Sequence, residues 1–122
     1  MKKILIVEDD QFISEMYLAK LKSEGFETIL AMDGQEGIDK TKEIKPDLVL
    51  LDIVLPKKDG FEVLNAIKED PETKNIKVAL WTNLGQPEDI QKGLESNADA
   101  YLIKAHSTPS QIVAKVKEIL GN

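Results

Sequence analysis

Two runs of four apolar residues, each followed directly by acidic residues, constrain the fold of this chain more than any other feature. Ile4–Val7 leads into Glu8 and Asp9, and Leu48–Leu51 leads into Asp52. Continuous runs of branched residues are typical of parallel strands buried on both faces. The carboxyl ends of parallel strands meet at one edge of an open α/β sheet, where such sheets bind ligands. We therefore expect the three acids to lie together.

Apolar runs alternate with amphipathic stretches along the whole chain, which predicts five strand–helix pairs. The expected strands are 3–7, 26–30, 47–51, 76–81 and 100–103, and the expected helices are 10–23, 33–43, 60–69, 87–96 and 109–120. Strand–helix–strand crossovers are right-handed and build a parallel sheet with helices on both faces. Because strands 3–7 and 47–51 are the most apolar, we expect them in the middle, with the more polar strand 26–30 at an edge.

The first and last helices carry the clearest expectations about which residues face the core and where each helix ends. The first helix is expected to turn four apolar side chains inward: Phe12, Ile13, Met16 and Leu21. Gly25 should end it. The last helix should begin at Pro109 after a Ser107 or Thr108 cap. Its inward stripe is expected to comprise Ile112, Val113, Val116, Ile119 and Leu120.

Length and composition predict one globular domain, residues 1–122, in which 42% of residues are hydrophobic and 31% are charged. The net charge of −6 argues against direct binding to nucleic acid or to a membrane surface. The chain has no cysteine, which excludes a disulfide framework and a thiolate metal site. No segment approaches the ~18 apolar residues of a membrane span, and the first residues do not resemble a signal peptide. A cytoplasmic location is expected.

The other predicted strand ends add a hydroxyl and an ammonium group to the acids, namely those of Thr82 and Lys104. Clustered carboxylates resist ionising together, and Mg²⁺, which prefers oxygen ligands, removes that conflict. A lysine beside a metal can hold phosphoryl oxygens, and a carboxylate can attack phosphorus to form an aspartyl phosphate. Each residue alone is usually a helix cap, a strand residue or a solvated side chain. Only their joint occurrence indicates phosphoryl or Mg²⁺ binding.

Four segments, ILIVEDD, LVLLDIVLPKKDGFEVL, LWTN and YLIKA, resemble in their order the motifs of receiver domains of two-component response regulators. The resemblance runs from about Lys3 to Leu120, and it is to receivers of the chemotaxis type. It implies a doubly wound, flavodoxin-like (βα)5 fold, a three-layer sandwich whose parallel five-stranded sheet has the order 2-1-3-4-5. It also implies a phosphoacceptor switch rather than an enzyme, one that phosphorylates itself from a donor and dephosphorylates slowly.

The resemblance assigns a role to each acid and to one backbone carbonyl. Asp52 corresponds to the phosphoacceptor and also to a metal ligand. Asp9 corresponds to the main acidic Mg²⁺ ligand, and Glu8 to one that binds directly or through water. The backbone carbonyl of Val54 corresponds to the third protein ligand. Asp10 matches a variable position, and we expect it to cap a helix.

The resemblance also assigns the groups that contact the phosphoryl group and respond to it. Lys104 corresponds to the residue that pairs with a phosphoryl oxygen, and the backbone N–H of Asn83 can bind another. Thr82 corresponds to the switch hydroxyl that moves toward the phosphoryl group. Tyr101 corresponds to the aromatic residue that turns inward when Thr82 moves, although a half-exposed strand tyrosine is an equal interpretation.

The partners implied by the resemblance lie on both sides of the switch. The phosphodonor would be a phosphohistidine on a sensor histidine kinase or on a phosphotransfer protein. An unidentified downstream effector would bind the face formed by helix 87–96, strand 100–103 and helix 109–120. Nothing resembling an effector domain follows the last helix, so a stand-alone receiver and an excised one both remain open.

Two positions depart from the family pattern. Ala105 stands where the family usually has a proline after a cis bond, and a non-prolyl cis bond costs ~2.5–4 kcal/mol. We therefore expect a trans or strained bond between Lys104 and Ala105. Asn83 stands where a small residue is preferred. Its bulk should crowd the attacking water and slow self-dephosphorylation, so Asn83→Ala should shorten the phosphoryl lifetime, although an amide that oriented the water would act in the opposite sense.

Three competing functions remain at this stage. A phosphorylation-independent interaction module on the same fold is kept open by the two departures. An aspartate-nucleophile phosphatase would need a second Asp at position 54, which is Val54. A flavin-binding protein of the same topology would need a glycine- and hydroxyl-rich phosphate loop after the first strand, where Glu8 and Asp9 have the wrong charge. Trp81 is expected in the core, and His106 is expected to be a polar surface residue.

Overall fold

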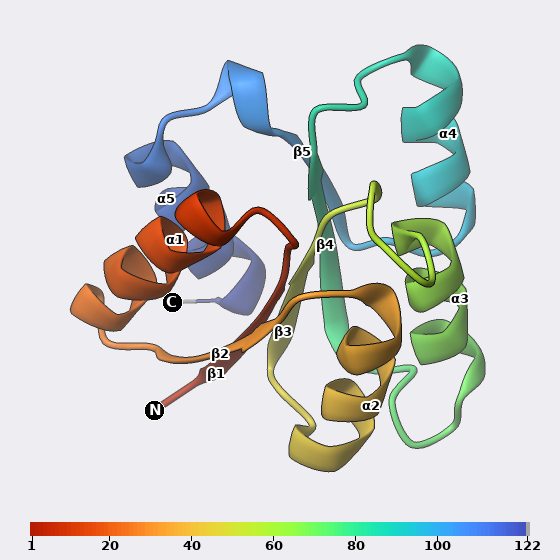
Figure 1. The fold of residues 1–122 in the computed structure, drawn as a ribbon, viewed down its shortest axis with the longest axis horizontal. Coiled ribbons are helices and arrows are strands. Elements are labelled where there is room, and N and C mark those ends of the chain that lie inside the picture. The colour runs from red at the N-terminus through yellow and green to blue at the C-terminus, as the bar shows by residue number, and fades with distance from the viewer. Residues whose placement is uncertain (122) are drawn as a thin grey trace.

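The structure, a computed structural model, describes residues 1–121 and consists of parallel strands that alternate with α-helices (Figure 1). The strands are β1 (Lys3–Val7), β2 (Glu27–Ala31), β3 (Leu48–Leu51), β4 (Lys77–Thr82) and β5 (Ala100–Ile103). The helices are α1 (Gln11–Ser23), α2 (Gly34–Ile44), α3 (Gly60–Glu69), α4 (Pro87–Glu95) and α5 (Pro109–Leu120). The sheet order β2-β1-β3-β4-β5 confirms the predicted doubly wound fold, with the apolar strands β1 and β3 inside and β2 at an edge.

The sheet is the middle of three layers. Helices α1 and α5 lie on one face, and α2, α3 and α4 lie on the other (Figure 1). Because successive strand residues point to opposite faces, Ile4 and Ile6 belong to the core beneath α1 and α5, whereas Leu5 and Val7 belong to the core beneath α2 and α3. Every residue of β3 is buried, as expected for a central parallel strand.

Local sequence sets where the helices begin and end. Asp10 caps α1, as expected, because its carboxylate accepts a hydrogen bond of 3.0 Å from the N–H of Ile13. Gly25 follows the end of that helix with φ of +95°, a conformation that favours glycine. Thr108 caps α5 in a reciprocal pair of hydrogen bonds with Gln111. The N-terminal caps of the first and last helices are therefore those that the sequence predicts.

The predicted inward face of α1 is wrong at two positions. Phe12 is 79% exposed and Met16 is 40% exposed, whereas Tyr17 and Leu21 are buried. Tyr17 packs edge-on against Trp81, with 4.6 Å between the ring centroids. Packing the tyrosine ring against the indole turns the helix so that Phe12 and Met16 face outward. Trp81 itself is fully buried, as expected of a core aromatic.

The strand register carries the polar residues to one edge of the sheet. Val7 pairs with Leu51, so Glu8 and Asp52 each follow the last paired residue of adjacent strands. Thr82 pairs with Ile103, which places Lys104 directly beyond the end of β5. No helix within residues 1–121 has the length and apolar character needed to cross a membrane.

Candidate functional site

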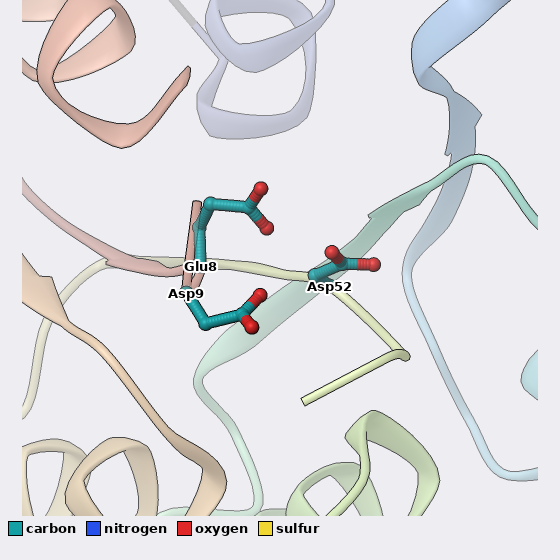
Figure 2. A group of neighbouring side chains, drawn as sticks. All are labelled: Glu8, Asp9 and Asp52. Carbon is teal, nitrogen blue, oxygen red and sulfur yellow. The ribbon is translucent and has the colours of Figure 1, made fainter. Parts of the chain in front are cut away.

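Three carboxylates converge at the carboxyl edge of β1 and β3. Oxygen atoms of Glu8, Asp9 and Asp52, one from each side chain, all lie within 4.8 Å of one another, and Figure 2 shows the carboxylates of Glu8 and Asp9 pointing toward Asp52. Glu8 and Asp52 are buried and Asp9 is exposed. The structure thus brings together the acids that follow the two apolar runs.

The ammonium group of Lys104 lies among these acids. Its Nζ donates hydrogen bonds of 2.9 Å to both carboxylate oxygens of Glu8 and one of 3.0 Å to Oδ2 of Asp52. The lysine side chain is only 11% exposed, so solvent screens these ion pairs weakly. Its Nζ also lies 4.4 Å from the ring centroid of Trp81, within the range of a cation–π contact. One buried lysine therefore offsets part of the charge of two buried acids.

The second carboxylate oxygen of Asp52 is held by the backbone that follows it. Oδ1 accepts a hydrogen bond of 2.7 Å from the N–H of Ile53 and a longer one of 3.4 Å from the N–H of Val54. Gly60, at the start of α3, donates a 2.7 Å hydrogen bond to the carbonyl of Ile53. The turn after β3 and the beginning of α3 together orient the Asp52 carboxylate, with Oδ2 facing Lys104.

The environments of Glu8 and Asp52 push their pKa values in opposite directions. Burial raises the pKa of Glu8 to about 8, with Asp52 adding to the effect and Lys104 opposing it. Burial acts in the same sense on Asp52, but hydrogen bonding with Glu8 and Thr82 and the charge of Lys104 outweigh it and lower the pKa of Asp52. The surroundings of Asp52 therefore favour its ionised form more strongly than the surroundings of Glu8 favour the ionised form of that residue.

The segment after β4 connects Thr82 to Tyr101. Thr82 is buried, and its hydroxyl accepts a 3.4 Å hydrogen bond from the N–H of Leu84. The hydroxyl of the half-buried Tyr101 donates to the carbonyl of the same Leu84. Burial raises the pKa of Tyr101 to about 12, helped by the negative charges of Asp89 and Asp52. The Tyr101 side chain is therefore uncharged at neutral pH. Its hydroxyl donates a hydrogen bond to the segment that directly follows Thr82.

The connection after β5 begins with a short 3₁₀ turn, Lys104–His106, which the sequence did not predict. The described residues contain no cis peptide bond, so the bond between Lys104 and Ala105 is trans, one of the two outcomes expected. Ala105 keeps the N–H that a proline would lack, and it donates a 3.1 Å hydrogen bond to Oδ1 of Asn83. His106 is exposed, consistent with a surface residue.

Two contacts at this site were not expected from the sequence. One is the contact of Lys104 with the Trp81 ring, for which the sequence carries no signal because nothing in it specifies which side of the indole is covered. The other is the hydrogen bond between Asn83 and Ala105. A signal for it existed, because these two departures from the family pattern directly follow Thr82 and Lys104 on neighbouring strands.

The donor set suits a hard divalent cation. Three carboxylates supply oxygen ligands only, and oxygen is the ligand that Mg²⁺ and Mn²⁺ favour. The cluster can therefore hold a metal ion, which would share Glu8 and Asp52 with the ammonium group of Lys104. Val54, a residue that is 63% exposed, lies beside this cluster, because its N–H donates a hydrogen bond to Asp52.

Comparison with known protein families identifies the family to which this chain belongs. The family model described as "Response regulator receiver domain" matches residues 4–117. The chain belongs to the receiver domain family of two-component response regulators. In this family the domain is a signalling switch, not a classical enzyme.

Individual relatives agree with this assignment. The DNA-binding dual master transcriptional regulator RpaA of Synechocystis sp. is 38% identical over 120 residues, which cover 98% of this receiver and 49% of RpaA. A CheY-like receiver domain from Methanospirillum hungatei JF-1 has a TM-score of 0.90 at 34% identity, covering 99% of this chain and 94% of that one. The Mn²⁺-bound form of response regulator Rcp1 has a TM-score of 0.84 at 32% identity, with coverages of 97% and 93%. This receiver spans about half the length of curated relatives such as RpaA.

Proposed function

We propose that Asp52 accepts a phosphoryl group from a phosphohistidine, carried by a sensor histidine kinase or a phosphotransfer protein of the cytoplasm, in a Mg²⁺-dependent reaction. The observation that carries this proposal is the position of the Asp52 carboxylate. Its Oδ2 lies 3.0 Å from the Lys104 ammonium, and the same side chain belongs to the acidic group formed with Glu8 and Asp9. A carboxylate kept ionised beside a cation and a potential metal site has what an aspartyl nucleophile requires.

In the proposed reaction, a carboxylate oxygen of Asp52 attacks phosphorus and forms a new P–O bond while the P–N bond to the donor imidazole breaks. The imidazole leaves with the electron pair of that bond and takes up a proton. The ammonium group of Lys104 stays in contact with the transferred phosphoryl group and offsets the negative charge on its oxygens. In the same proposal, the backbone N–H of Asn83 donates a hydrogen bond to another phosphoryl oxygen.

The same proposal assigns the metal to four protein groups. The carboxylates of Asp9, Glu8 and Asp52 and the backbone carbonyl of Val54 would hold Mg²⁺. When bound, the metal supplies positive charge against the developing charge of the phosphoryl oxygens. The similarity to the Mn²⁺-bound form of Rcp1 supports divalent-metal binding on this fold.

The switch would operate through the segment after β4. The Thr82 hydroxyl, bonded to the N–H of Leu84, would turn to the phosphoryl group, and Tyr101 would follow because it is bonded to the same residue. Such a shift between two states changes the surface of α4, β5 and α5, which we propose as the face that an effector reads. Slow hydrolysis of the aspartyl phosphate would reset the switch.

Intact-protein mass spectrometry after incubation with acetyl phosphate and Mg²⁺ tests this function. Wild type should gain the mass of one phosphoryl group, and chelating the metal should abolish the gain. Asp52→Asn should gain none, because an amide is not a nucleophile toward phosphorus. Asp39→Asn, an exposed change on α2, is the matched control and should behave as wild type.

Labelling of Asp52→Asn to the extent of wild type would show that another residue is the acceptor. Failure of wild type both to label and to bind beryllium fluoride, a phosphoryl mimic, in the presence of Mg²⁺ would favour the phosphorylation-independent interaction module instead.

A further inference from the structure

We propose that Asn83 is a positioning residue for Lys104, acting through the hydrogen bond that its side chain accepts from the N–H of Ala105 (3.1 Å). The inference rests on the proposed phosphoacceptor function and concerns how this receiver orients its lysine without the usual proline. Asn83 directly follows Thr82, and Ala105 directly follows Lys104. One side chain therefore joins the two segments that carry the phosphoryl-contacting groups.

The bond extends the pairing of two strands beyond their last backbone partners. The register of β4 and β5 ends with Thr82 opposite Ile103. Past this pair the chains separate, since one continues into a loop and the other into a 3₁₀ turn. The side-chain amide oxygen of Asn83 supplies a hydrogen-bond acceptor where the sheet no longer provides one. The start of the turn is thereby held to the end of β4.

The turn that begins at Lys104 has little else to fix it. Ala105 and His106 are exposed, so they contribute little packing. At the end of the turn, the N–H of Ser107 donates a long hydrogen bond of 3.4 Å to the carbonyl of Lys104. A lysine side chain has four rotatable bonds, and holding its Nζ at about 3 Å from two carboxylates requires a fixed backbone origin. The Asn83–Ala105 hydrogen bond supplies that restraint on the C-terminal side of Lys104, whereas β5 holds the chain on the N-terminal side.

The two departures from the family pattern are therefore complementary. A proline at position 105 has no N–H and could not donate to Asn83. An alanine or a glycine at position 83 would offer no side-chain acceptor to Ala105. Each departure gives the other a hydrogen-bond partner, so the pair replaces the conformational restraint of the proline with a hydrogen bond.

A double-mutant cycle tests this role, with the affinity for beryllium fluoride in saturating Mg²⁺ and the affinity for Mg²⁺ alone as its two readouts. Asn83→Ala and Asn83→Leu both remove the acceptor, but the leucine keeps the bulk of the side chain. Both should weaken beryllium fluoride binding about three- to tenfold, the loss expected for one hydrogen bond. The Mg²⁺ affinity should stay within about twofold, because the three carboxylates are unchanged and Lys104 is held less firmly rather than removed. Asn65→Ala, an exposed change on α3, is the control and should alter neither affinity.

The second arm of the cycle removes the donor. Ala105→Pro eliminates the N–H, and adding Asn83→Ala to it should then change beryllium fluoride affinity by less than about twofold, because the bond is already absent. Equal losses with and without Ala105→Pro would overturn the inference, as would wild-type affinity in Asn83→Leu. If Ala105→Pro does not fold, the comparison of the two Asn83 variants across both readouts decides alone. Absence of beryllium fluoride binding by wild type would instead refute the proposed function.

Discussion

Replacing Gly60 by alanine should destabilise this receiver, because α3 begins in direct contact with the backbone around Asp52. A Cβ added at Gly60 would lie 2.3 Å from the carbonyl oxygen of Asp52 and 2.5 Å from Cα of Ile53. Carbon atoms pack at about 3.5–4.0 Å, so the two backbone segments would have to separate by roughly 1 Å. Both obstructing atoms belong to the main chain and have no rotamer that would relieve the clash.

The size of the effect follows from two opposing contributions. Overpacking of this kind costs about 1–3 kcal/mol. Replacing glycine by alanine recovers about 0.4–1 kcal/mol by restricting the unfolded chain. A net loss of about 1–2 kcal/mol remains. With an unfolding entropy of ~2.1 cal/mol/K per residue, a chain of 122 residues loses about 4 °C in Tm per kcal/mol. We expect Gly60→Ala to lower the Tm by about 4–8 °C.

Thermal unfolding followed by circular dichroism, with urea titration as a second measure, is the appropriate assay. Gly85→Ala is the matched control, because the closest atom to its Cβ would be Cδ1 of Ile103, at 3.1 Å, and that side-chain end can move. The control should stay within about 2 °C of wild type. A Gly60→Ala protein as stable as this control would show that the contact between α3 and the turn after Asp52 is looser than the structure indicates.

Three other outcomes are expected. Asp9→Asn should raise the Tm of the metal-free protein and weaken Mg²⁺ binding, because it removes one of three crowded carboxylates; an unchanged Tm would mean that Lys104 already compensates the cluster. Mg²⁺ or beryllium fluoride should change the emission of Trp81, whose ring centroid lies 4.4 Å from the Lys104 ammonium, and constant emission would show that the lysine does not respond. Burial raises the pKa of both tyrosines, that of Tyr101 to about 12, so the folded state holds protons that the unfolded chain releases near pH 10. Stability should therefore fall as the pH rises from about 10 to 12, and Tyr101→Phe should weaken that fall in urea titrations at each pH.

Elements with strong local signals were predicted with their correct ends. Helix α3 (Gly60–Glu69) and helix α5 (Pro109–Leu120) match the expected ranges because their caps are local: Asp59 and Thr108 bond to backbone groups three residues away. The strand after Pro46 and the strand ending at Thr82 differ from expectation by one residue. Hydrogen bonds to neighbouring strands determine those limits, and one strand's own sequence does not contain them.

The orientation of α1 shows where periodicity was insufficient. Phe12 and Met16 fit an apolar stripe as well as Tyr17 does, and the sequence offers no way to rank overlapping stripes. Packing decided between them, because only one rotation of the helix places Tyr17 against Trp81. Two large apolar side chains are left outside as a result.

The sequence predicts which acids lie together, because each follows an apolar run and parallel strands end at a common edge. It does not predict the contacts that these acids make. The bond from Lys104 to both Glu8 and Asp52, the contact of that lysine with Trp81, and the link between Asn83 and Ala105 join residues between 22 and 96 positions apart. Such contacts depend on register, rotamers and burial, and these quantities exist only after the strands have been placed side by side.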